Sequence, residues 1–293
     1  MSKEFSCWKY EEKNGQVVIL EYLGEEERVE IPEVLDEMAV TEVGKYAFYG
    51  KQVTEVRFPK TVTSIGCHGF YECRKLKKIA ISDYLIDIGD GAFKNCRQLS
   101  ELEIFIEQKR YSCLKNLLSE MNQQVLCKLY EKDQEIELVF PAYTHNYQEN
   151  TMARIINQET YGAGAHYREA ITKEKILYKE YDSRFYLAEN VDQAEALYAI
   201  ALARLQYPVE LLESAKERYK KFIESHWISC IQWLLKMEEY NKIKWLCQYE
   251  EMGKELIKQL LDTLQNADQI EVLSEMMEVY QKRFGRERKT FSL

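Results

Sequence analysis

The sequence predicts an α+β protein with two kinds of repeat, a solenoid of short parallel strands followed by stacked pairs of helices. Two observations predict this class: one short phrase recurs three times between residues 40 and 104, and apolar residues recur at helical spacing in the C-terminal half. Fixed periods of about 20 to 50 residues are typical of solenoids, in which each copy buries its apolar edge against the next. We expect a strand solenoid over residues 1–106, a junction over residues 107–147 and a helical repeat domain over residues 148–293.

The strand repeat combines two alternating phrases. The first reads Val40-Thr-Glu-Val-Gly-Lys-Tyr-Ala-Phe48, Val62-Thr-Ser-Ile-Gly-Cys-His-Gly-Phe70 and Leu85-Ile-Asp-Ile-Gly-Asp-Gly-Ala-Phe93, and its copies lie 22 and 23 residues apart. The second has an apolar residue at every other position: Val56-Arg-Phe58, Ile79-Ala-Ile81 and Leu102-Glu-Ile104. Period two predicts short strands with one buried face, and a glycine permits the tight turn between them. We expect the three phenylalanines to form one buried column.

The complete unit resembles a known repeat family. It reads Phe58-Pro59-Lys-Thr-Val62-Thr-Ser-Ile65-Gly66-Cys-His-Gly-Phe70-Tyr-Glu-Cys73-Arg-Lys-Leu76, which is similar to the BspA-type leucine-rich repeat of bacteria. The resemblance covers roughly residues 5–106, and it departs from the family pattern at Gly69, Ser82 and Lys51. It implies a binding module, and several members of the family are secreted adhesins.

The flanking segments have their own patterns. The Asn14-Gly15 turn predicts a capping hairpin over residues 5–31. Residues 114–121 should be a helix, and residues 125–130 and 135–140 a hairpin. From about Glu149 the apolar period changes to 3.6, with a clear helix over 191–205 and a 27-residue self-similarity over 227–280. These helix pairs resemble ankyrin repeats without the hairpin finger.

Composition excludes several function classes. The net charge of −9 gives no basic surface for nucleic acid, so no nucleic-acid partner is expected. No apolar run approaches the roughly 20 residues of a membrane span, so no membrane partner is expected either. Residues 1–9 have no apolar core of signal-peptide length, which indicates a cytoplasmic protein.

The eight cysteines are expected to be structural. Cys73 and Cys96 occupy the same repeat position and should stack as thiols in a reducing compartment. Cys67, His68 and Cys73 resemble part of a metal site, but no fourth ligand accompanies them. We therefore expect no metal and no cofactor.

One stretch outside the repeats has the composition of a ligand site. A glycine-containing loop that opens a helix near arginines could hold a phosphate or a carboxylate. It lacks the Lys-Ser/Thr of a P-loop. The structural alternative is a tight interhelix turn whose arginines pair with acidic neighbours. The residues concerned are Arg154, Gly162, Gly164, His166, Tyr167 and Arg168.

No catalytic residue can be assigned. The four histidines, His68, His145, His166 and His226, share no spacing that suits a catalytic pair, and no serine or cysteine lies in a nucleophile elbow. The 21 tyrosines could mark a contact surface, although helical spacing favours a place in the core.

The leading functional hypothesis is a non-catalytic intracellular scaffold that binds a protein or peptide partner. The alternatives are an enzyme or a small-ligand or phosphate sensor that uses the Gly162–Arg168 loop, and a cell-surface adhesin. In each repeat strand, residues between the apolar positions should face outward and form a binding patch. That patch would contain Glu55, Arg57, Lys78, Ala80, Glu101 and Glu103.

Overall fold

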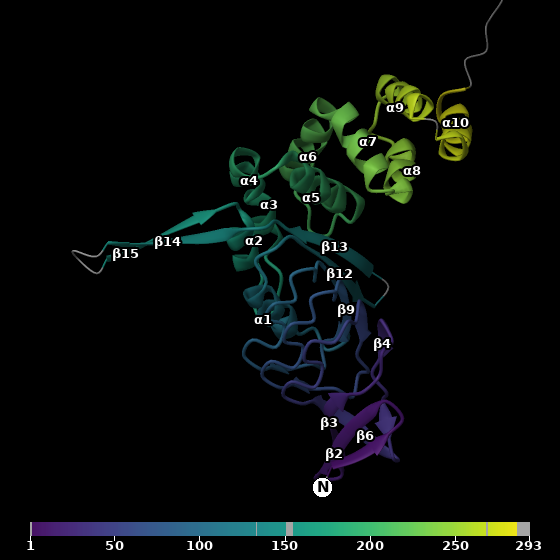
Figure 1. Ribbon diagram of the computed structural model, residues 1–293. Helices are drawn as coiled ribbons and strands as arrows, with labels where there is room; N and C mark the ends of the chain where they lie inside the picture. Colours follow the sequence, from purple (N-terminus) through teal and green to yellow (C-terminus); the bar gives the residue numbers. More distant parts are fainter. Residues whose placement is uncertain (1, 133, 151–154, 268, 286–293) are drawn as a thin grey trace, which may run out of the picture. The chain divides into compact units, whose positions relative to one another are not determined.

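The computed structural model describes residues 2–132, 134–150, 155–267 and 269–285. The chain forms two compact units: Met1–Ala196 with Val209–Leu211, and Leu197–Pro208 with Leu212–Leu293. All strands of the described residues belong to the first unit, and the second is helical (Figure 1). The predicted α+β class is confirmed. The boundaries expected at residues 106 and 147 both fall inside the first unit.

An antiparallel cap begins the first unit. It contains β1 (Ser2–Phe5), β2 (Trp8–Lys13) and β3 (Gln16–Tyr22). The β2–β3 turn has φ angles of 56° at Asn14 and 74° at Gly15, the left-handed backbone that a tight hairpin turn requires. Strand β3 then pairs in parallel with β6 (Met38–Val43), so the cap covers the edge of the first repeat. The predicted capping hairpin is confirmed, with β1 as an additional strand.

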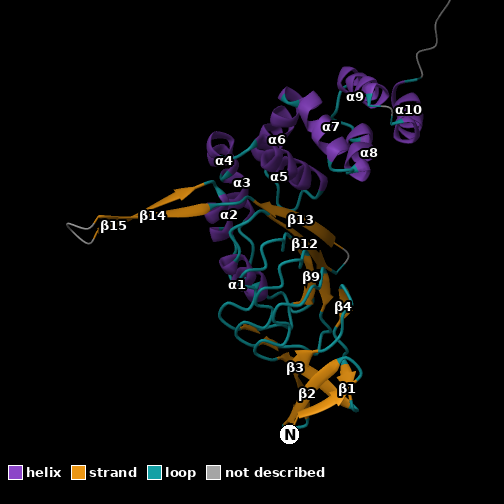
Figure 2. Cartoon of the chain, viewed as in Figure 1, coloured by secondary structure: helices purple, strands orange, loops and turns teal. Residues whose placement is uncertain are grey.

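The repeats build two ladders of parallel strands. The shorter ladder continues from β6 to β8 (Ser64–Ile65) and β10 (Asp87–Ile88), and β5 (Val34–Leu35) pairs with β6. The main ladder contains β4 (Arg28–Glu30), β7 (Glu55–Arg57), β9 (Lys78–Ser82) and β11 (Glu101–Ile106). Figure 2 shows that loops link the strands of these ladders without intervening helices.

The phenylalanine column lies between the two ladders. The ring of Phe70 stacks on Phe48 at 4.5 Å and on Phe93 at 5.1 Å between centroids, with interplanar angles of 18° and 7°. Tyr22 of the cap stacks on Phe48 at 5.2 Å and so extends the column into β3. All four rings are buried, which confirms the predicted column.

The turns beside the column bring successive copies into backbone contact. A Cβ added at Gly89 would lie 2.4 Å from the backbone nitrogen of Cys67, so only glycine fits this close approach. The thiol of Cys73 donates a hydrogen bond to the Phe48 carbonyl at 2.9 Å, and that of Cys96 to the Phe70 carbonyl at 3.1 Å. The two cysteines therefore occupy equivalent repeat positions, as predicted, and both are buried.

The far end of the solenoid adds a helix and a hairpin. Helix α1 (Ser112–Glu120) is followed by β12 (Val125–Glu131) and β13 (Gln134–Phe140), which pair in antiparallel register. Both elements were predicted. Strand β12 also pairs in parallel with β11 over six residue pairs, so the sheet order is β13-β12-β11-β9-β7-β4. The hairpin thus extends the main ladder.

The helix expected from Glu149 is wrong. Strands β14 (Thr144–Asn150) and β15 (Ile155–Tyr161) form an antiparallel hairpin with seven paired positions. Ile155, Ile156 and Thr160 are β-branched, which favours strand over helix. Three short helices complete this unit: α2 (Gly164–Glu169), α3 (Tyr178–Ser183) and α4 (Phe185–Val191).

The helical unit stacks its helices in consecutive pairs. After α5 (Ala194–Gln206) and α6 (Glu213–Ser225) come α7 (Trp227–Lys236), α8 (Tyr240–Gln248), α9 (Lys254–Asn266) and α10 (Ile270–Phe284). Helix α7 packs on α9 and α8 on α10, which is the arrangement predicted from the 27-residue period. Met237 and Ile270, two apolar residues of this unit, are exposed because they lie at the ends of their helices.

Candidate binding surfaces

The predicted patch lies on one face of the main ladder. Strand register places Glu55, Lys78 and Glu101 in one row across β7, β9 and β11. Arg57, Ala80 and Glu103 form the next row. The intervening apolar side chains, such as Ile79 and Leu102, are fully buried on the opposite face. The structure therefore brings the six predicted residues together.

The charges on this face are paired with one another. The ammonium nitrogen of Lys78 lies 2.7 Å from Glu103 and 3.8 Å from both Glu55 and Glu101. A second cation, Arg57, lies 3.7 Å from Glu103. Burial lowers the pKa of Lys78, but its hydrogen bond to Glu103 and the surrounding carboxylates raise this pKa above its ordinary value. The face therefore carries a fixed network with little unpaired charge.

Ala80 does not contribute exposed surface. Its side chain was predicted to face outward, and its register position is on that face, but the residue is only 1% exposed. The reason is its size, because the longer side chains of the network around it cover a methyl group. The prediction that Ala80 belongs to the binding patch is therefore wrong.

The face extends beyond the six predicted residues onto β12. In register, Leu126 lies opposite Glu101, Lys128 opposite Glu103 and Tyr130 opposite Phe105. The amino group of Lys128 donates a hydrogen bond to Glu101 at 2.9 Å, which continues the charge network. We call the combined surface the outer sheet face; it contains Glu55, Arg57, Lys78, Glu101, Glu103, Phe105, Leu126, Lys128 and Tyr130.

An aromatic pair marks one end of the outer sheet face. The half-buried rings of Phe105 and Tyr130 stack across the strands with centroids 5.2 Å apart and planes 20° from parallel. The sequence analysis missed this pair. The signal was available, because Leu126, Lys128 and Tyr130 alternate with the apolar residues of β12 as the earlier outward positions do.

A second aromatic cluster lies on the turns of the solenoid. The rings of Tyr49 and Tyr71 stack with centroids 5.8 Å apart and planes 8° from parallel, and that of Tyr46 stacks on His68 at 5.3 Å. Tyr46 and Tyr49 are exposed. We call these four residues the turn-edge cluster. The preference for placing tyrosines in the core is correct for Tyr22, Tyr167 and Tyr181 and wrong for this cluster.

The glycine loop has structural contacts in place of an open anion site. It follows β15, a strand in a region where the sequence analysis expected helices. The backbone amide of Ala163 donates to both carboxylate oxygens of Asp192, at 3.3 and 3.2 Å. A Cβ added at Gly164 would lie 2.0 Å from the Pro141 carbonyl oxygen, and Gly162 has a φ of 86°. Both glycines are needed by the turn itself.

The arginine of this loop bonds to backbone carbonyls. The guanidinium of buried Arg168 donates to the carbonyl oxygens of Pro141 at 2.7 Å, Gly164 at 2.9 Å and Gln123 at 2.7 Å. Burial lowers its pKa to about 10. The expectation that it pairs with acidic neighbours is therefore wrong, since carbonyl oxygens from three separate segments are its partners.

The remaining residues of the loop have separate and unrelated contacts. The ring of Tyr167 is buried against Tyr181 at 4.7 Å. The half-buried His166 lies 3.6 Å from Glu169. Arg154 lies outside the described residues. The described part of the loop thus holds the β15–α2 connection together and presents no convergent set of donors.

The described residues contain no grouping of histidine, cysteine, aspartate or glutamate side chains able to hold a metal ion. His68 stacks on the ring of Tyr46, and the thiol of Cys73 donates a hydrogen bond to a backbone carbonyl. The turn that contains both residues is therefore held by ring packing and this hydrogen bond. Among the helices described, none has the length and apolar character needed to cross a membrane.

Comparison with known proteins agrees with this architecture. Residues 40–137 match the family model of the BspA type Leucine rich repeat region, in six copies. The solenoid is a BspA-type leucine-rich repeat region. The match runs through β12 and into β13, further than the resemblance seen in the sequence. Repeats of this type suggest a scaffold for protein interaction, and no catalytic role is shown.

Several solved structures are similar to part of the chain. A leucine rich cell surface protein from Faecalibacterium prausnitzii is 28% identical over 39% of this chain and 34% of its own, with a TM-score of 0.32. A leucine-rich repeat protein from Bacteroides capillosus is 23% identical over 45% of this chain and 98% of its own, with a TM-score of 0.34. One from Bacteroides ovatus is 28% identical over 35% and 31%, with a TM-score of 0.30.

The chain spans about a third of the length of the Faecalibacterium protein. No protein of curated function matches the chain.

Proposed function

We propose that this protein is a non-catalytic scaffold that binds a protein partner through the outer sheet face. The observation that carries the proposal is the cross-strand stack of Phe105 on Tyr130 beside a rigid charge network. Aromatic residues are enriched among the few residues that supply most of the binding energy in protein interfaces, and polar residues around them supply selectivity. A surface fixed by strand pairing also loses little conformational freedom on binding.

The charged residues of the outer sheet face would not by themselves supply the binding energy for a partner. Lys78, Arg57 and Lys128 already have carboxylate partners within 4 Å, so a partner's charges must compete with existing pairs. Such paired surface charges contribute little net attraction and mainly reject unsuitable partners. The aromatic pair, with the apolar side chain of Leu126 on the same face, is the better source of binding energy.

Affinity capture from native lysate tests the proposal. The full chain is compared with a Phe105→Thr/Tyr130→Thr variant, since threonine keeps the strand preference while it removes both rings. The matched control is Tyr46→Asn/Tyr49→Asn, which removes two exposed rings of the turn-edge cluster. Quantitative mass spectrometry should find the same specific partner with the wild type and the control, and lose it with the first variant. The opposite pattern would assign binding to the turn edge and reject the proposal.

We also propose that the protein works in the cytoplasm. All eight cysteines are free thiols, and those of Cys73 and Cys96 donate hydrogen bonds to buried carbonyls that a disulfide would leave without a donor. An antibody to the chain should find it in the soluble fraction of lysed source cells and find it resistant to protease added to intact cells. Digestion on intact cells would favour the adhesin alternative.

A further inference from the structure

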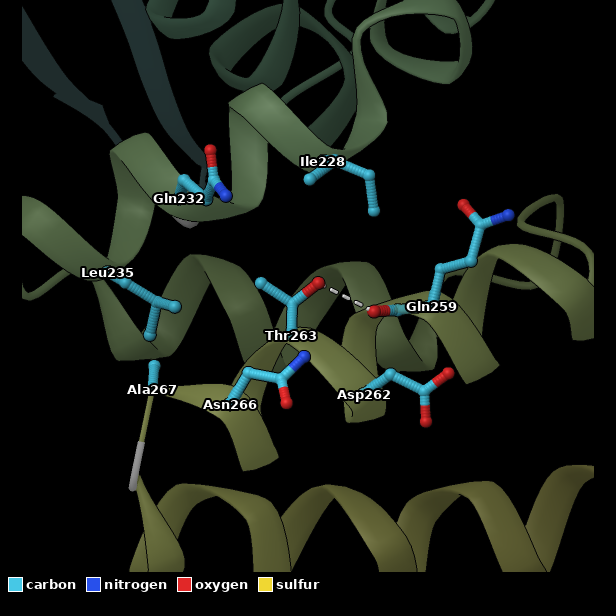
Figure 3. A pocket seen from close by; sticks show the side chains of 8 residues that line it. All are labelled: Ile228, Gln232, Leu235, Gln259, Asp262, Thr263, Asn266 and Ala267. Atoms are coloured by element: carbon cyan, nitrogen blue, oxygen red, sulfur yellow. Dashed lines mark hydrogen bonds between the residues drawn. The ribbon is translucent and has the colours of Figure 1, made fainter.

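The helical unit contains a groove between the first helices of two consecutive pairs (Figure 3). It lies between α7 and α9 and has a volume of about 550 Å³, within the usual range of about 300–1,000 Å³ for ligand sites. Its lining includes Ile228, Gln232, Leu235, Gln259, Asp262 and Asn266.

Two glutamines occupy the same repeat position in this groove. Gln232 on α7 and Gln259 on α9 lie 27 residues apart, which is the period of the helix pairs. Both side chains are exposed, and within the described residues neither amide group has a hydrogen-bond partner. Asn266 adds a third primary amide about two turns further along α9. The repeat therefore presents two equivalent amides on one surface, and a third lies beside them.

Primary amides at this spacing match the backbone of an extended peptide. Each amide carries a donor and an acceptor and so can pair with the C=O and N–H of a peptide group. Packed helices lie about 8–10 Å apart, and an extended chain advances about 3.3 Å per residue. Equivalent amides on neighbouring helices are thus separated by about three residues of an extended peptide.

The other lining residues define the side chains that such a peptide would carry. Asp262 is the only charged residue of the lining and has no ion-pair partner within the described residues. A carboxylate in this position favours a basic side chain. Ile228, which is 41% exposed, and Leu235 flank Gln232 on α7 and offer an apolar contact beside it.

We propose that the α7–α9 groove binds an extended peptide segment with a basic residue, and that this site is separate from the outer sheet face. Gln232 and Gln259 bond the peptide backbone, Asp262 pairs with the basic side chain, and Ile228 and Leu235 contact an apolar neighbour. The proposal does not depend on what the sheet binds, because it stands on the groove residues alone.

The test uses the full chain and two pools of fluorescein-labelled nonapeptides. One pool has arginine fixed at the centre and the other has glutamate, with the remaining positions drawn equally from alanine, leucine, threonine and glutamine. Fluorescence anisotropy measures binding. The wild type should bind the arginine pool and discriminate against the glutamate pool. Gln232→Ala/Gln259→Ala should weaken binding by about tenfold, because two hydrogen-bonding contacts to the peptide backbone are lost.

Three further variants make the result specific. Asp262→Asn should remove the preference for arginine. Gln265→Ala/Gln281→Ala changes two exposed helical glutamines outside the groove and should leave binding unchanged. Phe105→Thr/Tyr130→Thr should also leave it unchanged, which separates this proposal from the proposed function. Equal binding of both pools, no binding of either, or an equal loss in the Gln265/Gln281 control would overturn the proposal.

Discussion

The ammonium nitrogen of Lys78 lies 2.7 Å from the carboxylate of Glu103, diagonally across two parallel strands. In register Lys78 faces Glu101, and Glu103 faces Ala80. The pair therefore crosses beside Ala80, whose methyl group is covered. This diagonal contact ties the two rows of the outer sheet face together, and it makes the face a fixed surface instead of a set of independent charges.

The stability of this network should fall at high pH. The folded pKa of Lys78 is raised, so its contribution is complete below the unfolded lysine pKa of about 10.4 and disappears as the pH rises through the higher folded value. The free energies of unfolding of the wild type and Lys78→Gln should differ at pH 9 and converge once the pH exceeds the raised folded pKa of Lys78. Urea titrations measure both. The control is Lys13→Gln, which replaces an exposed lysine at the cap turn. A difference in the free energy of unfolding between the wild type and Lys78→Gln that stays constant as the pH rises would contradict the assignment.

Removal of the central ring of the phenylalanine column should be costly. Phe70 is fully buried and stacks on two other rings, so Phe70→Ala should lower the free energy of unfolding by about 3–5 kcal/mol. Phe5, which is 59% exposed on β1, supplies the matched control, and Phe5→Ala should cost less than about 1 kcal/mol. Similar losses for the two variants in a denaturant titration would show that the column is not the core.

Arg168 should behave as a structural residue. Its replacement by methionine leaves three carbonyl oxygens without their donor, and we expect a loss of about 3 kcal/mol. Arg74→Met removes an exposed arginine that pairs with Glu72 and should cost less than about 1 kcal/mol. Thermal unfolding followed by circular dichroism compares the two. If Arg168→Met were as stable as the wild type, the structural role would be contradicted and Arg168 would again be a candidate ligand-binding residue.

The buried thiols should be unreactive. Burial raises the pKa of Cys113 and of Cys230 to about 12, so almost no thiolate is present at pH 8. Iodoacetamide should label Cys67, which is exposed, and more slowly Cys7, with the other six protected until urea unfolds the protein. Peptide mass spectrometry gives the rates. Labelling of Cys73 as fast as Cys67 would show that its turn opens readily.

Local periodicity explains why the solenoid could be predicted. Each copy contacts its neighbour at the same backbone positions, so the same residue types recur there, as with Gly66, Gly89 and the phenylalanines. The period of the sequence therefore predicts how the copies stack. The same reasoning applied to the 27-residue period, and it located the helix pairs α7–α8 and α9–α10. Features repeated in the structure were repeated in the sequence.

Features made by segments distant in sequence were missed. The Phe105–Tyr130 stack depends on the register of β11 with β12, which no repeated phrase encodes. The partners of Arg168 come from residues 123, 141 and 164, so its chemistry could not be read from the loop around it. The β14–β15 hairpin was missed because a weak helical period outweighed three β-branched residues.

Hydroxyl-radical footprinting of the full chain, alone and with its captured partner, tests the central claim most directly. The rings of Phe105 and Tyr130 are half-buried, while Tyr46 and Tyr49 are exposed on the turn edge and serve as internal references. The account predicts a severalfold fall in oxidation of Phe105 and Tyr130 in the complex, with Tyr46 and Tyr49 unchanged. Unchanged oxidation of Phe105 and Tyr130 together with protection of Tyr46 and Tyr49 would contradict it.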